Sequence, residues 1–493
     1  MADERRDVTL SRRNLLLLGG VAAAAGGCQT VAKFIAGDSP VVASQLKEDP
    51  AARLLNRMGY GPRPGDIERV QQQGLDAWFK DQLKPGDEPI ELRMALSAMA
   101  IHQLNSWDLR DWPTQRVIQQ LQTASILQAV VSPYTVRERA VQFWTDHLNV
   151  YASKGMSAHR LPTYMTTVIR PHALGSFPEM IRQSAYSTAM LLYLDQQNST
   201  ARHPNENYGR ELLELHTLGV DGGYTQKDVM EVARCFTGWT EERRFWTQQL
   251  GTGQMKGKGS FRFDENLHDK GEKVVLGQRI PAGGGVEDGE RVLEIVTTHP
   301  ATARYIGIKL AKFYAGDDSA KLAAKVEKTF NDTKGDVAAM LTTIYESGEW
   351  RDAPAASKRP IDFVVGSMRA LGATGVGNGA VVQALEYMGQ APYNWPMPDG
   401  YPPETEAWTG SMLGRWNFAL DLANGINGTG TNANDQLKRW KGDSDAENAI
   451  RAVFHQTSDA LEATRLLEEL RRPDLTNAQR VALALSSPEY QWR

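Results

Sequence analysis

The apolar residues of this 493-residue chain are spaced as in α-helices. They recur at intervals of three and four, as Ala140, Phe143, Trp144 and His147 do, and this spacing puts them on one helical face. The alternation with period two that marks half-buried strands is scarce. We therefore predict a single large all-α domain over residues 48–493, without an internal repeat.

One region interrupts the helical pattern. Residues from about 240 to 290 are rich in glycine, for example Gly283, Gly284 and Gly285. We predict an irregular insertion here that contains a small β-hairpin between residues 260–263 and 274–276. Long irregular segments of compact domains are often functional, so we expect this insertion to act as a lid.

Composition and charge exclude several classes of protein. Hydrophobic residues make up 41% and charged residues 23% of the chain, an ordinary globular balance. The 55 basic and 59 acidic residues give a net charge of −4, which argues against nucleic acid as a partner. The apolar runs are shorter than the roughly 18 residues that a membrane-spanning helix needs.

The first 28 residues have the features of an export signal. Residues 11–16 read Ser-Arg-Arg-Asn-Leu-Leu and resemble the twin-arginine motif. A short run of moderate hydrophobicity follows up to Gly27. We expect export to the periplasm or cell envelope, with residues 29–47 as a tether before the folded domain.

Cys28 follows Ala25, Gly26 and Gly27, which resembles a lipoprotein cleavage box with Cys28 as the lipidated residue. The box usually has Leu where Ala25 stands, so simple cleavage after an alanine is the alternative. A lipid on Cys28 would be the membrane attachment. Cys235, the other cysteine, is expected to be a small packing residue, which leaves the mature chain without an internal disulfide.

Two helices carry capping signals. Thr135 and Glu138 have the spacing of a capping box at the start of a helix that we expect to reach about Val150. Thr225 and Asp228 have the same spacing and predict another helix, which ends before residue 238.

His147 lies on the apolar and aromatic face of the first of these helices. It is either a core histidine bonded to a carbonyl oxygen or a desolvated acid, base or ligand whose pKa is displaced. Both interpretations stay open from the sequence.

A further helix is predicted between Pro204 and Gly219. Asn205 or Asn207 can cap its start, and Gly219 can end it in a left-handed turn. At about 100° per residue, one polar stripe runs along this helix. The stripe consists of Asn207, Arg210, Glu211 and Glu214.

The polar stripe has two interpretations. Arg210 and Glu214 can form a solvated ion pair at i,i+4, worth a few tenths of a kcal/mol. Alternatively, two carboxylates one turn apart form a site, where repulsion raises one pKa while Arg210 keeps the other group charged. With different pKa values, one carboxyl can serve as an acid and the other as a base.

His216 lies on the opposite face of the same helix, so it cannot bind a metal together with Glu211 and Glu214.

The same helix carries a long motif. Residues 205–220 read Asn-Glu-Asn-Tyr-Gly-Arg-Glu-Leu-Leu-Glu-Leu-His-Thr-Leu-Gly-Val, and residues 236–239 read Phe-Thr-Gly-Trp. Further matching pieces follow one another along the chain at residues 54–61, 143–147, 193–195, 223–225, 228–229, 268–273, 299–303 and 388–390. Together they resemble the DUF1800 family of bacterial proteins of unknown function, from about 50 to 490. Gly209 stands where we expect Ala.

The resemblance implies an exported and mainly helical protein. Members are often encoded beside alkaline-phosphatase/sulfatase-like proteins, which implies work on extracellular material with such a partner. The resemblance implies no particular reaction or cofactor.

We predict a polar cleft in which carboxylates and imidazoles meet. The candidate catalytic residues are Glu211, Glu214, His147 and His268. The candidate substrate-binding residues are Arg210, Asn205, Asn207, Asp269, Trp239 and Trp395. Trp395 belongs to a loop rich in proline and aromatic residues, whose rings either stack on sugars or cap the core.

Three functions fit these residues. The first is an enzyme that uses Glu and His acid–base chemistry on extracellular material such as a glycan, with Asp269 as another source of a second carboxylate. The second is a non-catalytic envelope protein that binds or assists a secreted partner. The third is a metal site with ligands from separate helices, such as His147, His268 and Glu211. Serine-hydrolase elbows, Walker loops and C-x-x-C motifs are absent from the sequence.

Overall fold

The structure is a computed structural model that describes residues 49–242, 259–316, 319–354, 356–377, 379–425, 428–457, 459 and 464–493. The described chain is one mainly helical domain (63%) with two small two-stranded sheets, so the predicted fold class is confirmed. Among the described residues, each helix is too short or too polar to span a bilayer. The predicted signal, Cys28 and the tether lie outside the described residues, as does part of the predicted insertion.

The helices of the first part of the chain precede the sheets. They are α4 (Pro50–Met58), α5 (Asp66–Gln73), α6 (Leu75–Gln82), α7 (Ile90–Ser97), α8 (Ala100–Gln103), η1 (Asp108–Asp111), α9 (Thr114–Val131), α10 (Thr135–His147), α11 (Ser157–Tyr164), η2 (Met165–Ile169), α12 (Arg170–His172), α13 (Phe177–Tyr186), α14 (Thr188–Tyr193), η3 (Gln196–Asn198), α15 (Glu206–Glu211), η4 (Leu212–Thr217) and α16 (Gln226–Cys235).

The strands and the remaining helices complete the domain. They are β1 (Trp239–Glu241), β2 (Phe261–Phe263), η5 (Glu265–Leu267), β3 (Lys273–Val275), β4 (Gln278–Ile280), α17 (Val286–Thr297), α18 (Pro300–Ala315), α19 (Ala320–Thr333), α20 (Val337–Ser347), α21 (Glu349–Asp352), α22 (Pro360–Ala370), α23 (Ala380–Tyr387), η6 (Thr405–Ser411), α24 (Met412–Ala423), α25 (Ala433–Leu437), α26 (Asp445–Phe454), α27 (Thr464–Leu470), α28 (Asn477–Ser486) and η7 (Pro488–Gln491).

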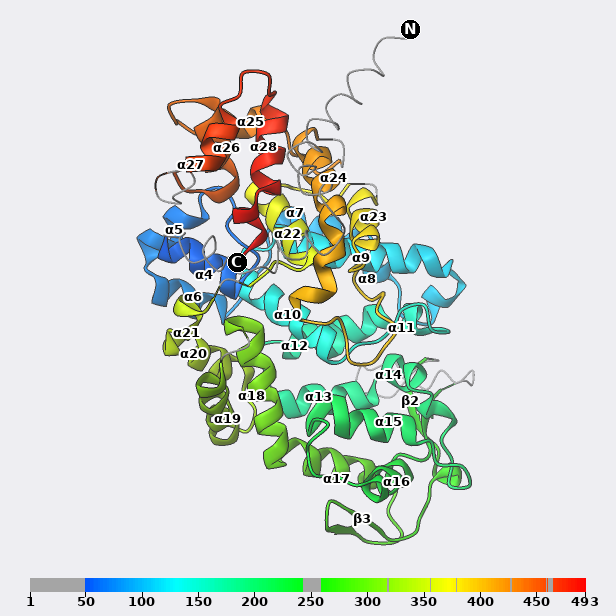
Figure 1. Ribbon diagram of the computed structural model, residues 1–493. Helices are drawn as coiled ribbons and strands as arrows, with labels where there is room; N and C mark the ends of the chain where they lie inside the picture. Colours follow the sequence, from blue (N-terminus) through cyan, green and yellow to red (C-terminus); the bar gives the residue numbers. More distant parts are fainter. Residues whose placement is uncertain are drawn as a thin grey trace, which may run out of the picture.

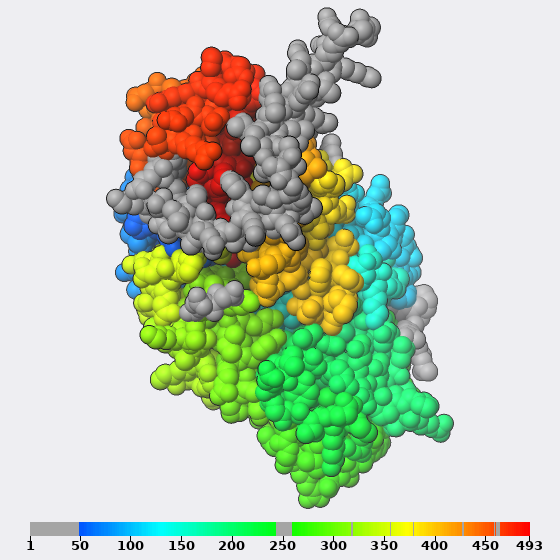
Figure 2. Space-filling model, viewed as in Figure 1, coloured from blue at the N-terminus to red at the C-terminus, as the bar shows by residue number. Residues whose placement is uncertain are grey.

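Two hydrophobic cores lie at opposite ends of the molecule and α9 joins them. Its N-terminal half, including Val117 and Leu121, belongs to the core formed mostly by α4 to α21. Its C-terminal half, including Ile126 and Val130, belongs to the core formed mostly by α22 to α28. Figure 1 shows α13 to α20 at one end and α25 to α28 at the other, with α9 to α12 between them. The same division is visible on the surface in Figure 2.

The two predicted capping boxes have different outcomes. Thr225 and Asp228 form the predicted box at α16. At α10 the prediction is wrong, because the Thr135 hydroxyl accepts a hydrogen bond from the backbone N–H of Tyr60 at 3.1 Å. Glu138 instead accepts hydrogen bonds from arginines, among them Arg170. Both side chains therefore bond to residues outside the helix and do not cap its first turn.

The predicted hairpin has the right strands and the wrong partners. Residues 261–263 form β2, but β2 pairs with β1 in the register Trp239 with Phe263. Residues 273–275 form β3, which pairs with β4 in a tight hairpin. In the described part of the insertion, β1 packs on α14 and β3 packs on α16.

A buried ionic cluster holds the two cores together. Asp362, near the start of α22, pairs with Arg139 of α10 and with Arg359, and Arg493 lies 3.7 Å from the same carboxylate. The side chains of Asp362, Arg139 and Arg359 are buried, and that of Arg493 is 9% exposed. Burial by itself raises the pKa of Asp362, but the charges of the arginines outweigh it and hold that pKa far below its usual range. Arg359 also binds Asp146 at 3.1 Å, so the cluster extends to the end of α10.

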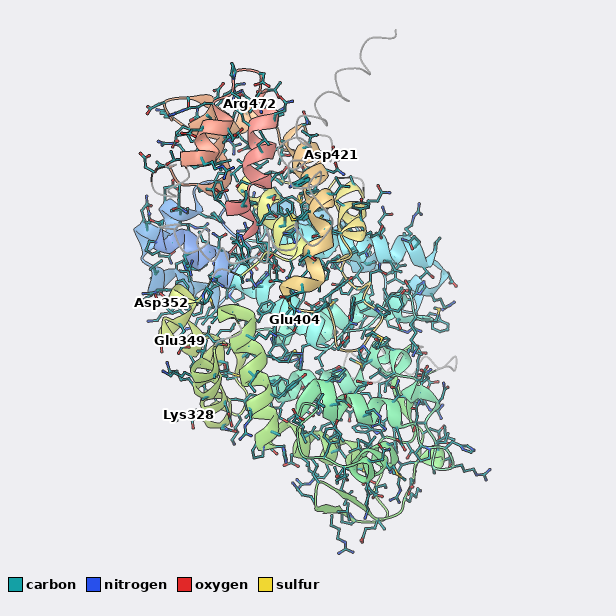
Figure 3. The ribbon with its side chains drawn as sticks, in the orientation of Figure 1. Lys328, Glu349, Asp352, Glu404, Asp421 and Arg472 are labelled. Carbon is teal, nitrogen blue, oxygen red and sulfur yellow. The ribbon has the colours of Figure 1, made fainter. Side chains whose placement is uncertain are left out.

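The segment from residue 390 to 408 crosses the molecule between the cores. Tyr393 belongs to the first core, and its hydroxyl bonds to Ser125 of α9 at 2.6 Å. Glu404 pairs with Lys312 of α18 at 3.1 Å and lies near the middle of the molecule in Figure 3. We call residues 390–408 the crossing loop.

Because Gly400 has no side chain, the crossing loop can pack directly against the backbone of α10 at Asp146. Its φ is +77°, and a Cβ built there would lie 2.1 Å from the carbonyl oxygen of Asp146. We predict that Gly400→Ala lowers the free energy of unfolding by about 2 kcal/mol or more, since it combines backbone strain with a backbone clash. Denaturant unfolding measures the change.

The matched control is Gly410→Ala, where an added Cβ meets no atom within 4 Å and φ is not positive. It should leave stability within about 0.5 kcal/mol of the wild type. Equal stability of the two variants would contradict the close approach at Gly400.

Candidate functional site

The predicted helix between Pro204 and Gly219 changes its winding halfway. Asn205 caps α15 by accepting a hydrogen bond from the backbone N–H of Asn207, as predicted, and Gly219 has the predicted positive φ of 84°. From Leu212 the backbone is π-helical, and the N–H of Leu218 bonds to the carbonyl of residue 213. A π-turn contains more residues than an α-turn, so Glu214 is rotated away from its predicted place in the polar stripe.

Gly209 brings α15 close to α16. A Cβ at Gly209 would lie 3.2 Å from a methyl group of Val232 and 3.3 Å from the carbonyl oxygen of Val229. The glycine therefore costs helix propensity but permits a close helix packing that alanine would disturb. This packing fixes α15 before the π-helical segment begins.

Glu211 is a half-buried carboxyl with an unusual acidity. Burial raises its pKa, and so do the charges of Glu214 and Asp399, whereas Arg210 lowers it; the result is a pKa of about 7. Glu214 accepts a hydrogen bond from the hydroxyl of Tyr224 at 3.1 Å. We call Glu211, Glu214 and Asp399 the carboxylate site.

The crossing loop brings Asp399 to this site. The Trp395 indole N–H donates to the Asp399 carboxylate at 2.8 Å. Asn149, just after α10, donates to the carbonyl oxygens of Trp395 and Met397 at 3.0 and 2.6 Å. The hydroxyl of Tyr193 donates to the next carbonyl, that of residue 396, at 2.8 Å. The loop is thus held on two sides beside Glu211, and Trp395 is partly exposed there.

His147 and Lys309 form a pair next to the carboxylate site. Burial lowers the pKa of His147 well below its usual value, and Lys309 lowers it further. The neutral imidazole donates from Nε2 to the carbonyl of His216 at 3.1 Å, so its Nδ1 accepts from the Lys309 ammonium at 3.1 Å. Burial also lowers the pKa of Lys309, to about 8, although Asp146 and Asp399 raise it.

His147 therefore holds the backbone of the π-helical segment through a hydrogen bond. It bonds to the backbone two residues after Glu214, and its ring centroid lies 6.2 Å from that of Tyr305. The charge of Glu214 in turn raises the pKa of Tyr305, after the larger effect of burial. Tyr305 is thus near both the histidine and the carboxylates. The bond to a carbonyl oxygen is that of a core histidine, and the pKa is displaced as the second interpretation expected, while a role of His147 as acid, base or ligand stays a prediction.

His268 and Asp269 belong to a different network. The ring of His268 bonds to Thr237 at 2.8 Å and to Asp288 of α17 at 3.2 Å, and Asp288 also binds the buried Lys273 at 2.6 Å. Asp269 pairs with Arg234 of α16 at 2.8 Å. Among the described residues, none of these hydrogen bonds or ion pairs reaches Glu211 or Glu214.

Four predicted binding residues have structural partners instead. Asn205 and Asn207 donate to the carbonyls of residues 195 and 194, at 2.9 and 3.2 Å. Arg210 pairs with Glu206 at 3.1 Å, one turn before it, and not with Glu214 as the ion-pair interpretation had it. Trp239 is fully buried against aromatic residues, so its ring has no face for a substrate.

The proposed metal ligands do not assemble. Within the described ranges, no group of three or more His, Cys, Asp or Glu side chains has the geometry to hold a metal ion. His147 is engaged with Lys309 and the carbonyl of residue 216, and His268 lies in its own network.

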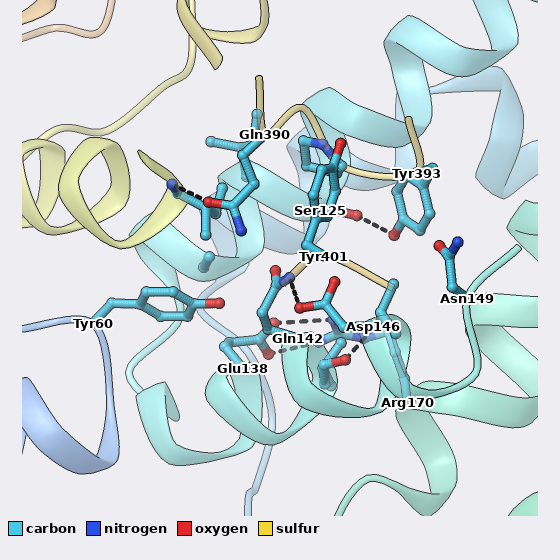
Figure 4. A pocket seen from close by; sticks show the side chains of 16 residues that line it. Tyr60, Ser125, Glu138, Gln142, Asp146, Asn149, Arg170, Gln390, Tyr393 and Tyr401 are labelled. Carbon is cyan, nitrogen blue, oxygen red and sulfur yellow. Dashed lines mark hydrogen bonds and ion pairs between the residues drawn. The ribbon is translucent and has the colours of Figure 1, made fainter. Parts of the chain in front are cut away.

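A cavity of about 30 Å³ lies elsewhere, at the junction of the two cores. Figure 4 shows Tyr60, Asp146, Tyr401 and Gln390 around it. It has room for one or two water molecules. None of the four predicted catalytic residues lines it, so it is not the predicted cleft.

Sequence reasoning missed Lys309, Asp399, Tyr193 and Tyr305. One signal was available for Lys309, which follows the buried Ile306 at helical spacing and so lies near the inner face of α18. Tyr193 belongs to a motif segment that was recognised without a role. The sequence gives no indication that Asp399 belongs to the site, because only the folded loop places it near Glu211.

The raised pKa of Glu211 predicts how stability depends on pH. An unfolded glutamate ionises near pH ~4.3, whereas Glu211 in the folded protein ionises at about 7. The folded state thus loses stability as pH rises from roughly 4.5 to 7, because the unfolded chain gives up this proton first. Glu211→Gln should leave stability unchanged at pH 4.5 and raise it at pH 8 by about 1 kcal/mol, a value reduced for partial exposure.

Denaturant unfolding at the two pH values measures this difference. Glu206→Gln is the control, since Glu206 lies on the same helix and pairs with Arg210 in solvent. The effect of Glu206→Gln on the free energy of unfolding should not become more stabilising between pH 4.5 and pH 8. A Glu211→Gln effect that is equal at both pH values would contradict the raised pKa.

One protein family matches the chain over most of its length. The family described as "Protein of unknown function (DUF1800)" matches residues 53–492, which is nearly the whole described chain. Neither a curated protein nor a solved structure matches the chain. The chain belongs to the DUF1800 family.

Proposed function

We propose that the chain is a hydrolase-like enzyme that acts on extracellular material such as a glycan, with the carboxylate site as its catalytic centre. The observation that carries the proposal is the pKa of about 7 at Glu211, beside two further carboxylates. A general acid works best when its pKa lies near the working pH. Protonated Glu211 is the acid, and Glu214 or Asp399 is the base.

The surroundings of the carboxylate site support a sugar as substrate. Trp395 is partly exposed beside Asp399, and the partly exposed Tyr305 lies within the electric field of Asp399 and Glu214. Aromatic rings next to acids are suited to stack on a sugar ring and orient it. His147 bonds to the backbone of the π-helical segment, and Lys309, which donates to His147, supplies positive charge beside the acids.

We predict that the purified protein releases reducing ends from one or more members of a panel of bacterial envelope polysaccharides. Glu211→Gln should lower the rate by about 100-fold or more, the usual contribution of a general acid. Wild-type activity should fall as pH rises above about 7, where Glu211 loses its proton.

Glu206→Gln is the matched control and should keep the wild-type rate. Unchanged activity of a folded Glu211→Gln variant would overturn the catalytic role of Glu211. Binding of a polysaccharide without any release by the wild type would favour a non-catalytic envelope protein. The structural partners of Asn205, Asn207 and Arg210 fit that alternative.

The cellular setting is proposed from the sequence. Residues 11–16 support export through the twin-arginine route to the periplasm or envelope, and Cys28 supports a lipid anchor. An alkaline-phosphatase/sulfatase-like exported protein is the proposed partner. We infer no nucleic-acid partner, given the net charge of −4.

We predict that Arg12→Lys combined with Arg13→Lys retains the protein in the cytoplasm, as measured by cell fractionation. The control is Arg5→Lys with Arg6→Lys, which changes the other arginine pair of this segment and should leave export unchanged. Normal export of the first variant would contradict the twin-arginine route.

A further inference from the structure

The buried ionic cluster around Asp362 contains more positive than negative side chains. Arg139, Arg359 and Arg493 surround Asp362, and Asp146 binds Arg359 on the far side. Three guanidinium groups thus face two carboxylates, an excess of one positive charge. Burial of an uncompensated charge costs several kcal/mol, so this excess needs a counter-charge.

Five guanidinium nitrogens of this cluster have no hydrogen-bond partner although they are buried. They are Nε and Nη2 of Arg139, Nη2 of Arg359, and Nε and Nη1 of Arg493. Arg139 is 0% exposed, so bulk water does not reach these N–H groups. A buried donor without an acceptor costs about 1–3 kcal/mol.

Two other buried arginines of the same protein are fully bonded. Arg369 donates from all three nitrogens, to carbonyl oxygens and to Asp66. Arg415 also uses all three, with Ser411, Gln491 and the carbonyl of residue 358 as acceptors. Burial alone therefore does not leave an arginine without acceptors, as it does at several nitrogens of the Asp362 cluster.

The three guanidinium groups converge on one aromatic ring. The central carbons of Arg139, Arg359 and Arg493 lie 4.5, 5.4 and 5.9 Å from the ring centroid of Phe313. Burial lowers the pKa of Arg493, and the charge of Arg139 lowers it further. Each of the three guanidinium groups carries at least one unpaired N–H donor, and a single atom-sized acceptor can serve donors on several side chains where a large ligand cannot.

We propose that a small monovalent inorganic anion of the size of chloride binds among Arg139, Arg359 and Arg493. The anion accepts hydrogen bonds from the unpaired guanidinium N–H groups and brings the charge of the cluster to zero. It is a structural ion at the junction of the two cores, separate from the carboxylate site.

The test compares thermal melting of the full chain in sodium chloride and in sodium gluconate at equal ionic strength, because gluconate is too large for the site. Chloride should raise the melting temperature by about 2 °C or more and should saturate. Bromide should act like chloride. Identical melting in chloride and gluconate would overturn the proposal, because water alone would then satisfy the cluster.

Two variants locate the effect. Arg139→Met should remove the difference between the salts, whereas Arg415→Met, at a fully bonded buried arginine, should lower stability and keep the difference. Retention of the chloride effect in Arg139→Met would place the anion elsewhere. If Arg139→Met does not fold, anomalous diffraction from a bromide-soaked wild-type crystal decides the matter, and a lack of bromide density among the three arginines overturns the proposal.

Discussion

The carboxylate of Asp362 is the contact on which the rest of this fold depends. Helices α10 and α22 belong to different hydrophobic cores, and a polar junction between them would be unstable without a matched anion. Asp362 pairs with Arg139 and Arg359 there, away from solvent. Hydrophobic burial holds each core together, but directional ion pairs determine how the two cores meet, since a buried charge tolerates few geometries.

Asp146 connects this junction to the carboxylate site. Its side chain binds Arg359, and its backbone carbonyl faces Gly400 of the crossing loop. Its charge also acts on Lys309, which holds His147. The residues that form the carboxylate site come from α15, from η4 and from a loop nearly 200 residues later. Asp146 at the end of α10 thus contacts both the ionic cluster and the loop that carries Asp399.

The sequence predicts those features that depend on neighbouring residues. The all-α class, the Asn205 cap, the Thr225 capping box and the left-handed Gly219 follow from spacing and residue type. The π-helical turn does not, because a helical wheel drawn at about 100° per residue assumes α-helical winding along the whole segment. Trp239 and Trp395 look alike in the sequence, yet only packing decides that one is buried and the other partly exposed. Asp399 reaches Glu211, and Lys309 reaches His147, only through tertiary folding.

The central claim is that Glu211 remains a protonated acid near neutral pH because of burial and two neighbouring carboxylates. Titration of its side-chain carboxyl carbon by ¹³C NMR, assigned by comparison with Glu211→Gln, tests this claim most directly. The account predicts a midpoint at about pH 7, and a lower midpoint in Glu214→Gln. A midpoint near pH ~4.3, the value of a solvated glutamate, would contradict it.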